Sequence, residues 1–185
     1  AMTTVLVPVA DGSEEIETTA IVDTLRRADL EVTLASVGAD LTVTASRGVR
    51  LVADARLGDV ADRHFDLIAL PGGMPGAEHL AASGALRGML AAQHSRQAWI
   101  GAICAAPAVV LQAQGLLDGH AATCHPGFFE HLDPVRRRED RVVVDGHLVT
   151  SRGPGTAIEF ALEMVAQLLV LEARDRVAGP MLVRE

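Results

Sequence analysis

The first part of the chain passes from an apolar run to an amphipathic segment and then to another apolar run. Val5–Val9 is followed by turn-forming residues at 11–13 and then by a helical period. Val32–Ser36 comes next and is alternating and β-branched. Strand, helix and strand in this order are typical of a parallel sheet. We expect Ser13 to cap the helix. The positions predicted for its buried face are Ile16, Thr19, Ala20, Val22 and Leu25.

The same order of elements recurs further along the chain. Short apolar runs at Leu67–Leu70 and Trp99–Ile103 predict two more buried strands. Helical periods predict helices at Ser83–His94, at Ala106–Gln114 and at Thr156–Leu171. The pattern therefore predicts an α/β protein with an open, mostly parallel sheet that is covered by helices on both faces.

Two segments alternate apolar and polar residues with the period of a strand. One covers residues 39–55 and the other covers residues 141–151, where Asp145-Gly146 suits a tight turn. We expect both to form hairpins that decorate the main sheet. Since no linker or internal repeat interrupts the pattern, residues 2–185 are expected to form one domain. Ala1, before Met2, is interpreted as a tag remnant.

Composition and charge narrow the classes of function. The chain has 185 residues, of which 49% are hydrophobic and 22% charged, so it can bury a large core. A net charge of -8 argues against nucleic-acid or anionic-membrane partners, and the basic run Arg136–Arg138 is flanked by acids and interpreted as solvated. Without a bilayer-length apolar run or a secretion signal, the protein is expected to be cytoplasmic, with Cys104 and Cys124 as free thiols.

Polar, glycine or cysteine residues interrupt the apolar pattern at the carboxyl ends of the predicted strands. They are Asp11–Glu17, Gly72-Gly73, Cys104 and Cys124-His125. Ligands of open parallel sheets bind at this edge. We therefore expect the functional site to be assembled from these four segments.

Cys104 lies where a buried strand gives way to a helix. Ala102 and Ala106, two positions to either side, are small enough for a sharp nucleophile elbow. The start of the following helix would lower the pKa of the thiol and favour a thiolate. The alternative is a structural cysteine that packs as a small hydrophobe.

Two further segments fit chemistry at this thiol. Gly72 and Gly73 would let backbone N–H groups point at a developing oxyanion, although a double glycine also suits a tight turn. Glu14 and Glu15 fit exposed residues in the first turn of a helix, whereas Glu17 has mostly apolar neighbours. A carboxyl group held near the core would stay protonated and donate a hydrogen bond to a thiolate. The alternative for Glu17 is a solvated glutamate.

With these residues identified, the chain resembles the ThiJ/PfpI superfamily, and most closely its parkinsonism-associated and bacterial YajL-like branch. The similarity rests on "GSEEIET", "SRGVRL", "LPGG", "GAICAAPA", "TCHPG" and "SRGPGTAIEFAL". It implies a flavodoxin-like three-layer sandwich, a homodimer, and an elbow cysteine at Cys104 with Glu17 as its acid. The other residues it implies at the site are Gly73 and Ala105 as oxyanion donors, His125 near the thiol, Arg47 from across the dimer, and Arg152 with Pro154 close by.

One position separates this chain from the proteases of the superfamily. PfpI-type proteases carry a histidine directly after the cysteine, where this chain has Ala105. A cysteine peptidase is therefore disfavoured, although His125 is an alternative imidazole. A metal site of Cys104, Cys124 and His125 is also disfavoured, since neighbouring residues on a strand point to opposite faces. Cys124 is interpreted as a packing thiol, and His64, His94 and His131 as surface residues.

The first functional hypothesis is a cysteine-dependent enzyme that needs no cofactor. It would act on reactive dicarbonyls or their early adducts with proteins and nucleotides, as glyoxalase III-like and deglycase-like enzymes do. Cys104 would attack the aldehyde carbon and Glu17 would move protons. The alternative is an oxidative-stress sensor or redox-regulated chaperone that works through oxidation of Cys104.

Overall fold

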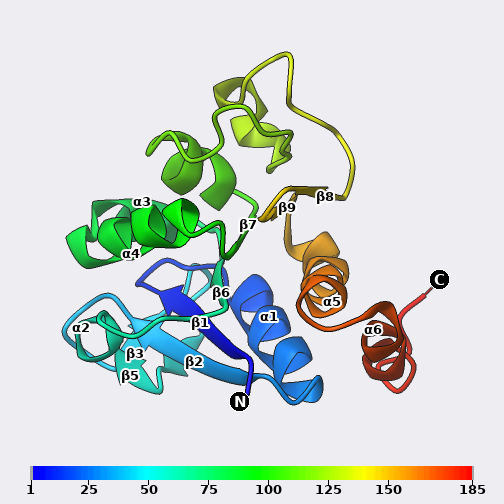
Figure 1. Cartoon of the computed structure of the whole chain (residues 1–185). Coiled ribbons are helices and arrows are strands. Elements are labelled where there is room, and N and C mark those ends of the chain that lie inside the picture. Colours follow the sequence, from blue (N-terminus) through cyan, green and yellow to red (C-terminus); the bar gives the residue numbers. More distant parts are fainter. Residues whose placement is uncertain (1, 185) are drawn as a thin grey trace.

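A seven-stranded sheet forms the centre of the computed structural model, which describes residues 2–184 (Figure 1). All neighbouring strands are parallel except the last pair, β9 and β8. In spatial order, the strands are β5 (Ala55–Arg56), β2 (Glu31–Ser36), β1 (Thr4–Val9), β6 (Leu67–Leu70), β7 (Trp99–Ile103), β9 (Leu148–Ser151) and β8 (Val142–Asp145). The strand order reverses direction between β1 and β6, which in such sheets opens a crevice at the carboxyl ends.

Helices cover both faces of this sheet (Figure 1). One face carries α1 (Glu15–Arg27), α5 (Ala157–Leu168) and α6 (Leu171–Ala178). The other carries α2 (Leu57–Val60), α3 (Gly76–Ala82), α4 (Gly84–Ser95) and the π-helix η1 (Pro107–Gln112). Two short 3-10 helices, η2 (Pro126–His131) and η3 (Pro154–Thr156), lie in the later loops.

The strands feed two separate cores, as a sheet covered on both faces requires. In β1, Val5, Val7 and Val9 pack towards α1 and α5, whereas Leu6 packs towards α3 and α4. This alternation follows from the two-residue period of a strand. The predicted flavodoxin-like three-layer sandwich with a mostly parallel sheet is confirmed.

The two hairpin segments behave differently from each other. Residues 141–151 form β8 and β9 with a turn at Gly146, whose φ is +60°, as predicted. Residues 39–55 form β3 (Thr42–Thr44) and β4 (Arg50–Val52), an antiparallel pair separate from the main sheet. The chain then enters the main sheet at β5.

Two predicted helices differ from the observed ones. We predicted one helix over Thr156–Leu171. The structure has α5, which ends at Leu168, and α6, which begins at Leu171, and the two are separate because Val170 between them is extended. The apolar period hid this break, since both helices bury residues in the same core. The segment after Cys104 is π-helical rather than α-helical: Ala113 donates its N–H to the carbonyl of Ala108, five residues back.

The start and buried face of α1 also differ from the prediction. Ser13 Oγ accepts a hydrogen bond from the N–H of Ala10, and the cap of α1 is instead the side chain of Glu14. Ile16 is 58% exposed, and Thr19 is exposed as well. The helix is rotated from the predicted face because polar side chains occupy much of its buried side. The buried residues are Glu15, Glu17, Thr18, Ile21, Thr24 and Leu25.

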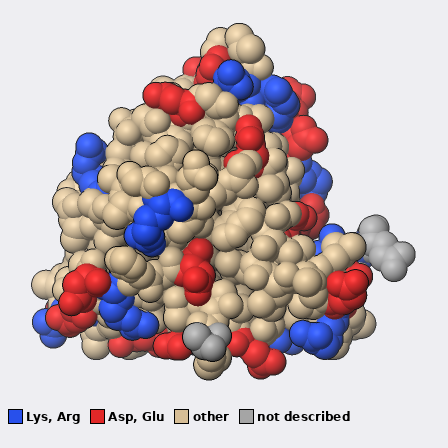
Figure 2. Space-filling view, viewed as in Figure 1, with Lys and Arg blue, Asp and Glu red and all other residues tan. Residues whose placement is uncertain are grey.

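Charged side chains of both signs are interspersed on the face shown in Figure 2, and no basic patch covers it. Most of the centre of this face is uncharged. Within residues 2–184, none of the helices combines the length and the apolar character needed to cross a membrane.

Three histidines form a cluster near the turn of the β8–β9 hairpin. His147 Nε2 and His94 Nδ1 are 2.9 Å apart, and the His120 ring lies 5.7 Å and 6.2 Å from the His147 and His94 rings. Asp145 Oδ1 is 3.7 Å from His120 Nδ1. His64 and His131 are exposed, as predicted, whereas His94 is half-buried because its ring packs against His147.

This cluster predicts a loss of stability in mild acid. Burial lowers the pKa of His147 below 6.5, and the charges of His94 and His120 lower it further. The unfolded chain therefore binds more protons than the folded chain as the pH falls below 6.5, so the free energy of unfolding decreases. Urea unfolding between pH 8 and pH 5 should show this decrease. His147→Gln should flatten the pH dependence and the exposed-site control His131→Gln should not; equal slopes in both variants would contradict the prediction.

Candidate active site

Cys104 occupies a sharp turn directly after β7. Its φ is +65°, a left-handed conformation that residues other than glycine rarely adopt. The turn is held on both sides, because the N–H of Cys104 donates to the carbonyl of Ser151 at 3.0 Å and its carbonyl accepts from the N–H of His125 at 2.8 Å. Its side chain thus leaves the carboxyl end of the sheet at the elbow expected from the sequence. Cys104 is only 8% exposed.

Glu17 places a fully buried carboxyl group beside this thiol. Its Oε1 accepts a hydrogen bond from the N–H of Gly72 at 2.9 Å, and its Oε2 is buried without a hydrogen bond of normal geometry. Burial raises the pKa of Glu17 to about 7; the negative charge of Glu14 adds to this, while the bonds to Gly72 and Cys104 oppose it. The interpretation of Glu17 as a carboxyl group near the core is therefore correct, and it is not a solvated glutamate.

The pKa of the Cys104 thiol is raised to about 12, mainly by burial and then by the charge of Glu17 and its hydrogen bond to the thiol. We predicted that the following helix would lower the pKa of the Cys104 thiol. That prediction is wrong as long as Glu17 is ionised. The N–H groups of Gly73 and Ala105 act in the opposite direction and favour the thiolate. Because part of the increase comes from the charge of Glu17, that part disappears when Glu17 is protonated. The two groups therefore titrate as a coupled pair.

The glycine loop after β6 contacts both members of this pair. A Cβ at Gly72 would lie 2.6 Å from the Cβ of Cys104, so only glycine fits there. The Gly72 N–H donates to Glu17 and is not free for an oxyanion, which corrects the prediction for that residue. The backbone N–H groups that lower the pKa of the Cys104 thiol are those of Gly73 and Ala105. These two remain the candidate oxyanion donors.

His125 is close to the elbow through its backbone. Its exposed imidazole accepts a hydrogen bond from the N–H of Gly127 at 3.0 Å through Nδ1. Only its backbone N–H is bonded to Cys104. Among the described residues no hydrogen bond joins this imidazole to the Cys104 thiol, so a role of His125 at the site stays a prediction.

The segments around Cys124 and Arg152 complete this edge. Cys124 is fully buried, its thiol faces the carbonyl of His125 at 3.3 Å, and burial raises its pKa to about 11, so it packs as predicted. Arg152 Nε donates to the Cys124 carbonyl at 3.0 Å, and Pro154 begins η3 just beyond. Both cysteines are free, and within residues 2–184 no group of three His, Cys, Asp or Glu side chains is suited to a metal ion.

Glu15 has a role that the sequence did not indicate. It was expected to be exposed but is buried, and its carboxylate accepts hydrogen bonds from Ser46 Oγ at 2.7 Å and from the N–H groups of Arg47 and Val49 at 2.9–3.3 Å. Burial raises its pKa, but these bonds outweigh burial and the net shift is downward. The exposed Arg47 side chain donates to the Ser46 carbonyl. Glu15 therefore fixes the loop that carries Arg47.

The fold is a flavodoxin-like sandwich, and its site pairs a cysteine on a strained elbow with a buried carboxyl group. These two features together define a class of α/β proteins with a cysteine at the carboxyl end of the sheet. Within this class, the chain belongs to the DJ-1/PfpI family, which matches residues 3–167. The resemblance inferred from the sequence motifs is thus confirmed.

This chain spans different shares of the length of its relatives. Protein DJ-1 homolog B of Arabidopsis thaliana is 50% identical over 87% of this chain, which spans only 37% of that relative. The Parkinson disease protein 7 homolog of Danio rerio is 39% identical, with 97% of each chain covered. The glutathione-independent glyoxalase DJR-1.2 of Caenorhabditis elegans is 37% identical, covering 96% of this chain and 94% of that one. The solved structure of oxidized Toxoplasma gondii DJ-1 has a TM-score of 0.98 at 46% identity, covering 99% and 100% of the two chains.

Proposed function

We propose that this protein is a cofactor-free, cysteine-dependent enzyme that acts on reactive dicarbonyls, such as methylglyoxal and glyoxal, or on their early adducts. The observation that carries the proposal is the buried pair of Cys104 and Glu17 beside the N–H groups of Gly73 and Ala105. The name of the Caenorhabditis elegans relative, a glutathione-independent glyoxalase, supports the same substrate class.

The first step is addition of the Cys104 sulfur to the aldehyde carbon of methylglyoxal. The thiol proton passes to Glu17, the new carbon–sulfur bond forms, and the aldehyde oxygen becomes an oxyanion. The N–H groups of Gly73 and Ala105 favour the thiolate, and they would also stabilise the oxygen that develops beside the sulfur. Protonation of this oxygen by Glu17 gives a hemithioacetal and restores the carboxylate.

The second step moves one proton between carbons. The Glu17 carboxylate removes the hydrogen from the former aldehyde carbon as a proton, which leaves an enediolate. Glu17 returns the proton to the neighbouring carbon, and the hydroxyl proton on the former aldehyde oxygen moves to the neighbouring oxygen. The product is a thioester of lactate on Cys104, which water hydrolyses to lactate and the free thiol. Oxidation at one carbon matches reduction at the next, so the reaction consumes only water.

The test of this proposal is the conversion of methylglyoxal to lactate by the protein, without glutathione and in the presence of a chelator. Proton NMR should show lactate forming at the rate at which methylglyoxal disappears. In D2O, deuterium should enter the methine position of lactate when the Glu17 proton exchanges with solvent. Disappearance of methylglyoxal without lactate would exclude the isomerisation and leave only adduct formation.

A redox sensor is the second candidate, and the position of Glu17 favours it. A protonated carboxyl group and two N–H groups next to the sulfur would stabilise a sulfinate. The related Toxoplasma gondii structure is described as oxidized. Burial and the raised pKa of Cys104 act against fast oxidation. Mass spectrometry after mild peroxide, combined with the turnover assay, separates the two functions; oxidation at Cys104 without turnover supports the sensor.

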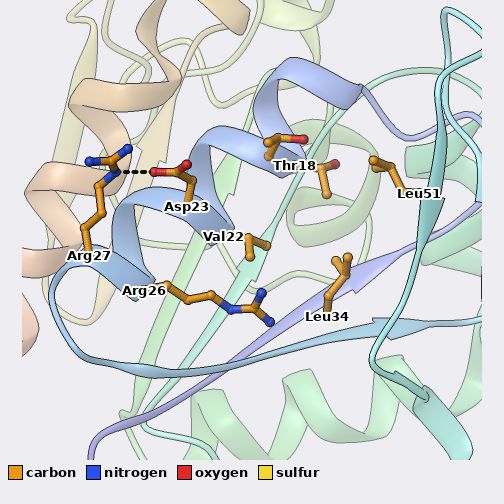
Figure 3. A pocket seen from close by; sticks show the side chains of 8 residues that line it. Thr18, Val22, Asp23, Arg26, Arg27, Leu34 and Leu51 are labelled. Carbon is orange, nitrogen blue, oxygen red and sulfur yellow. Dashed lines mark hydrogen bonds and ion pairs between the residues drawn. The ribbon is translucent and has the colours of Figure 1, made fainter. Parts of the chain in front are cut away.

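We also propose that two copies of the chain associate through the surface formed by α1 and β4. A hollow of about 560 Å³ lies there, lined by side chains of α1, Leu34 of β2 and Leu51 of β4 (Figure 3). Exposed apolar side chains lie on or next to the same two elements: Ile16 of α1 is 58% exposed, Val52 of β4 is 68% exposed, and Val49, just before β4, is 49% exposed. Burying such side chains against a second copy removes apolar area from water. The loop carrying Arg47 borders this surface, so Arg47 would reach the partner's site.

This association predicts that one carboxylate introduced at Ile16 disrupts the dimer. Ile16→Glu would bury an unpaired carboxylate at the interface and should shift the protein from dimer to monomer. Light scattering coupled to size-exclusion chromatography measures the mass directly. Val135→Glu is the matched control, because Val135 is 79% exposed and lies elsewhere on the surface. A monomeric parent protein, or an Ile16→Glu variant that stays dimeric, would contradict the proposal.

A further inference from the structure

One peptide group, between Cys124 and His125, joins the elbow to a charged side chain. Its N–H, from His125, donates to the carbonyl of Cys104 at 2.8 Å. Its carbonyl, from Cys124, accepts from Arg152 Nε at 3.0 Å. The carbonyl of Ser151, directly before Arg152, accepts from the N–H of Cys104 at 3.0 Å. Two consecutive residues after β9 therefore hold both sides of the Cys104 backbone, one directly and the other through this peptide group.

The Cys124 carbonyl is shielded from water, which makes its bond to Arg152 important. Cys124 is fully buried, so water does not take the place of this donor. A guanidinium N–H is a charged donor and forms a stronger hydrogen bond than a neutral one. A bond of this kind also polarises the peptide group and strengthens the bond made by the N–H at its other end. That second bond is the one to the Cys104 carbonyl.

Arg152 is itself fixed by contacts on several sides. Its backbone N–H donates to Thr156 Oγ1 at 3.2 Å, and its Nη1 donates to the carbonyl of Glu139 at 3.4 Å. Its Cζ lies 5.5 Å from the centre of the Phe129 ring, within the range of a cation–π contact. The half-buried side chain is therefore ordered without a substrate, as a residue that fixes the backbone must be.

The elbow needs this support because its backbone is strained. The φ of Cys104 is +65°, and such a conformation persists only where surrounding contacts hold it. If the Cys104 carbonyl lost its donor, the backbone could relax and move the sulfur relative to Glu17. A displacement of about 1 Å at a reacting atom lowers a rate by about 100-fold.

We propose that Arg152 is a positioning residue that holds Cys104 in its left-handed conformation through the Cys124–His125 peptide group. Its guanidinium acts on the place of the sulfur and contacts neither the thiol nor the substrate. The inference deepens the proposed function, on which its effect on turnover rests. Its effect on the backbone is measured independently of turnover.

Arg152→Met tests the proposal, because it keeps an apolar stem beside Phe129 and removes the donors. Amide hydrogen exchange, followed by NMR, should become about 10-fold faster or more at His125 and at Cys104, since a charge-assisted bond to a buried carbonyl is lost. The amides of β1 should keep their parent rates, which shows that the fold is intact. With methylglyoxal as substrate, kcat should fall by about 10- to 100-fold while KM stays within about 2-fold of the parent value.

Arg137→Met is the matched control. The Cζ of Arg137 lies 4.7 Å from the centre of the same Phe129 ring, and its Nη1 donates to the carbonyl of Phe129 rather than to that of Cys124. This variant should exchange at parent rates at His125 and Cys104 and keep its kcat. If Arg152→Met folds poorly, Arg152→Ala with and without added methylguanidinium gives the same comparison within one protein, because the added cation restores the donor.

The pattern of exchange and kinetics decides the outcome. Parent-like exchange at His125 and Cys104 in Arg152→Met would overturn the proposal. A raised KM with unchanged kcat would also overturn it, because Arg152 would then bind substrate. Equal changes in Arg137→Met would assign the effect to packing on Phe129 instead. A parent protein that converts no dicarbonyl, but whose Arg152→Met variant shows the local increase in exchange, refutes the proposed reaction and retains the role of Arg152.

Discussion

Cys104→Ser should lose dicarbonyl turnover by roughly a thousandfold or more, the range seen when a catalytic nucleophile is removed. The serine hydroxyl holds its proton far more tightly than a thiol, and Glu17, with a pKa of about 7, is too weak a base to remove it. The variant should fold, because serine is smaller than cysteine and can accept the Gly73 and Ala105 N–H groups. Lactate formation, measured by NMR with the folded fraction known from thermal unfolding, checks the prediction.

Cys124→Ser provides the matched control for this experiment. It makes the same chemical change at a fully buried thiol that packs in the core. Its turnover per folded molecule should remain close to that of the parent protein. Substantial activity in Cys104→Ser, or equal losses in both variants, would remove Cys104 from the mechanism.

Glu17→Gln should lower turnover by about 100-fold or more, which is the usual contribution of general acid–base catalysis. The glutamine amide oxygen can still accept the Gly72 N–H, so the geometry of the loop is retained, but the side chain can no longer take up and return a proton. In the parent protein the rate should change with pH around 7, where Glu17 titrates. In the variant this change should be absent.

A pH–rate profile of both proteins, with alkylation of Cys104 measured in parallel, gives the required data. If Glu17→Gln alkylates normally but does not turn over substrate, the acid acts in the proton transfer between carbons. If it does neither, Glu17 also supplies the thiolate. A variant with full activity and an unchanged pH profile would exclude Glu17 as the proton carrier.

The sheet and the elbow could be predicted from the sequence because they depend on local rules. Apolar runs identified β1, β6 and β7, and the small residues on either side of Cys104 indicated the sharp turn that its φ of +65° now shows. The glycines after β6 were identified as part of the site for the same reason. The break between α5 and α6 was missed, since the apolar period continues across it into one core.

The start of α1 could not be predicted in the same way, because its buried side is chosen by hydrogen bonds and not by hydrophobicity. Glu15 and Glu17 are buried where an apolar pattern predicts Ile16. Each carboxylate has donors from distant segments, at residues 46–49 and at Gly72, which no local window contains. The pKa of Cys104 was misjudged for a related reason: burial and the neighbouring acid outweigh the local helix.

The left-handed backbone at Cys104 has a consequence for the evolution of this chain. A side chain in that conformation costs about 1–2 kcal/mol, and glycine would relieve the cost. Selection for thermal resistance alone should therefore replace the sulfur with glycine. In a library of variants at position 104, selection for thermal stability should enrich glycine, and selection for activity should retain cysteine. The difference in thermal stability between the two selected variants measures the stability cost of the reactive cysteine.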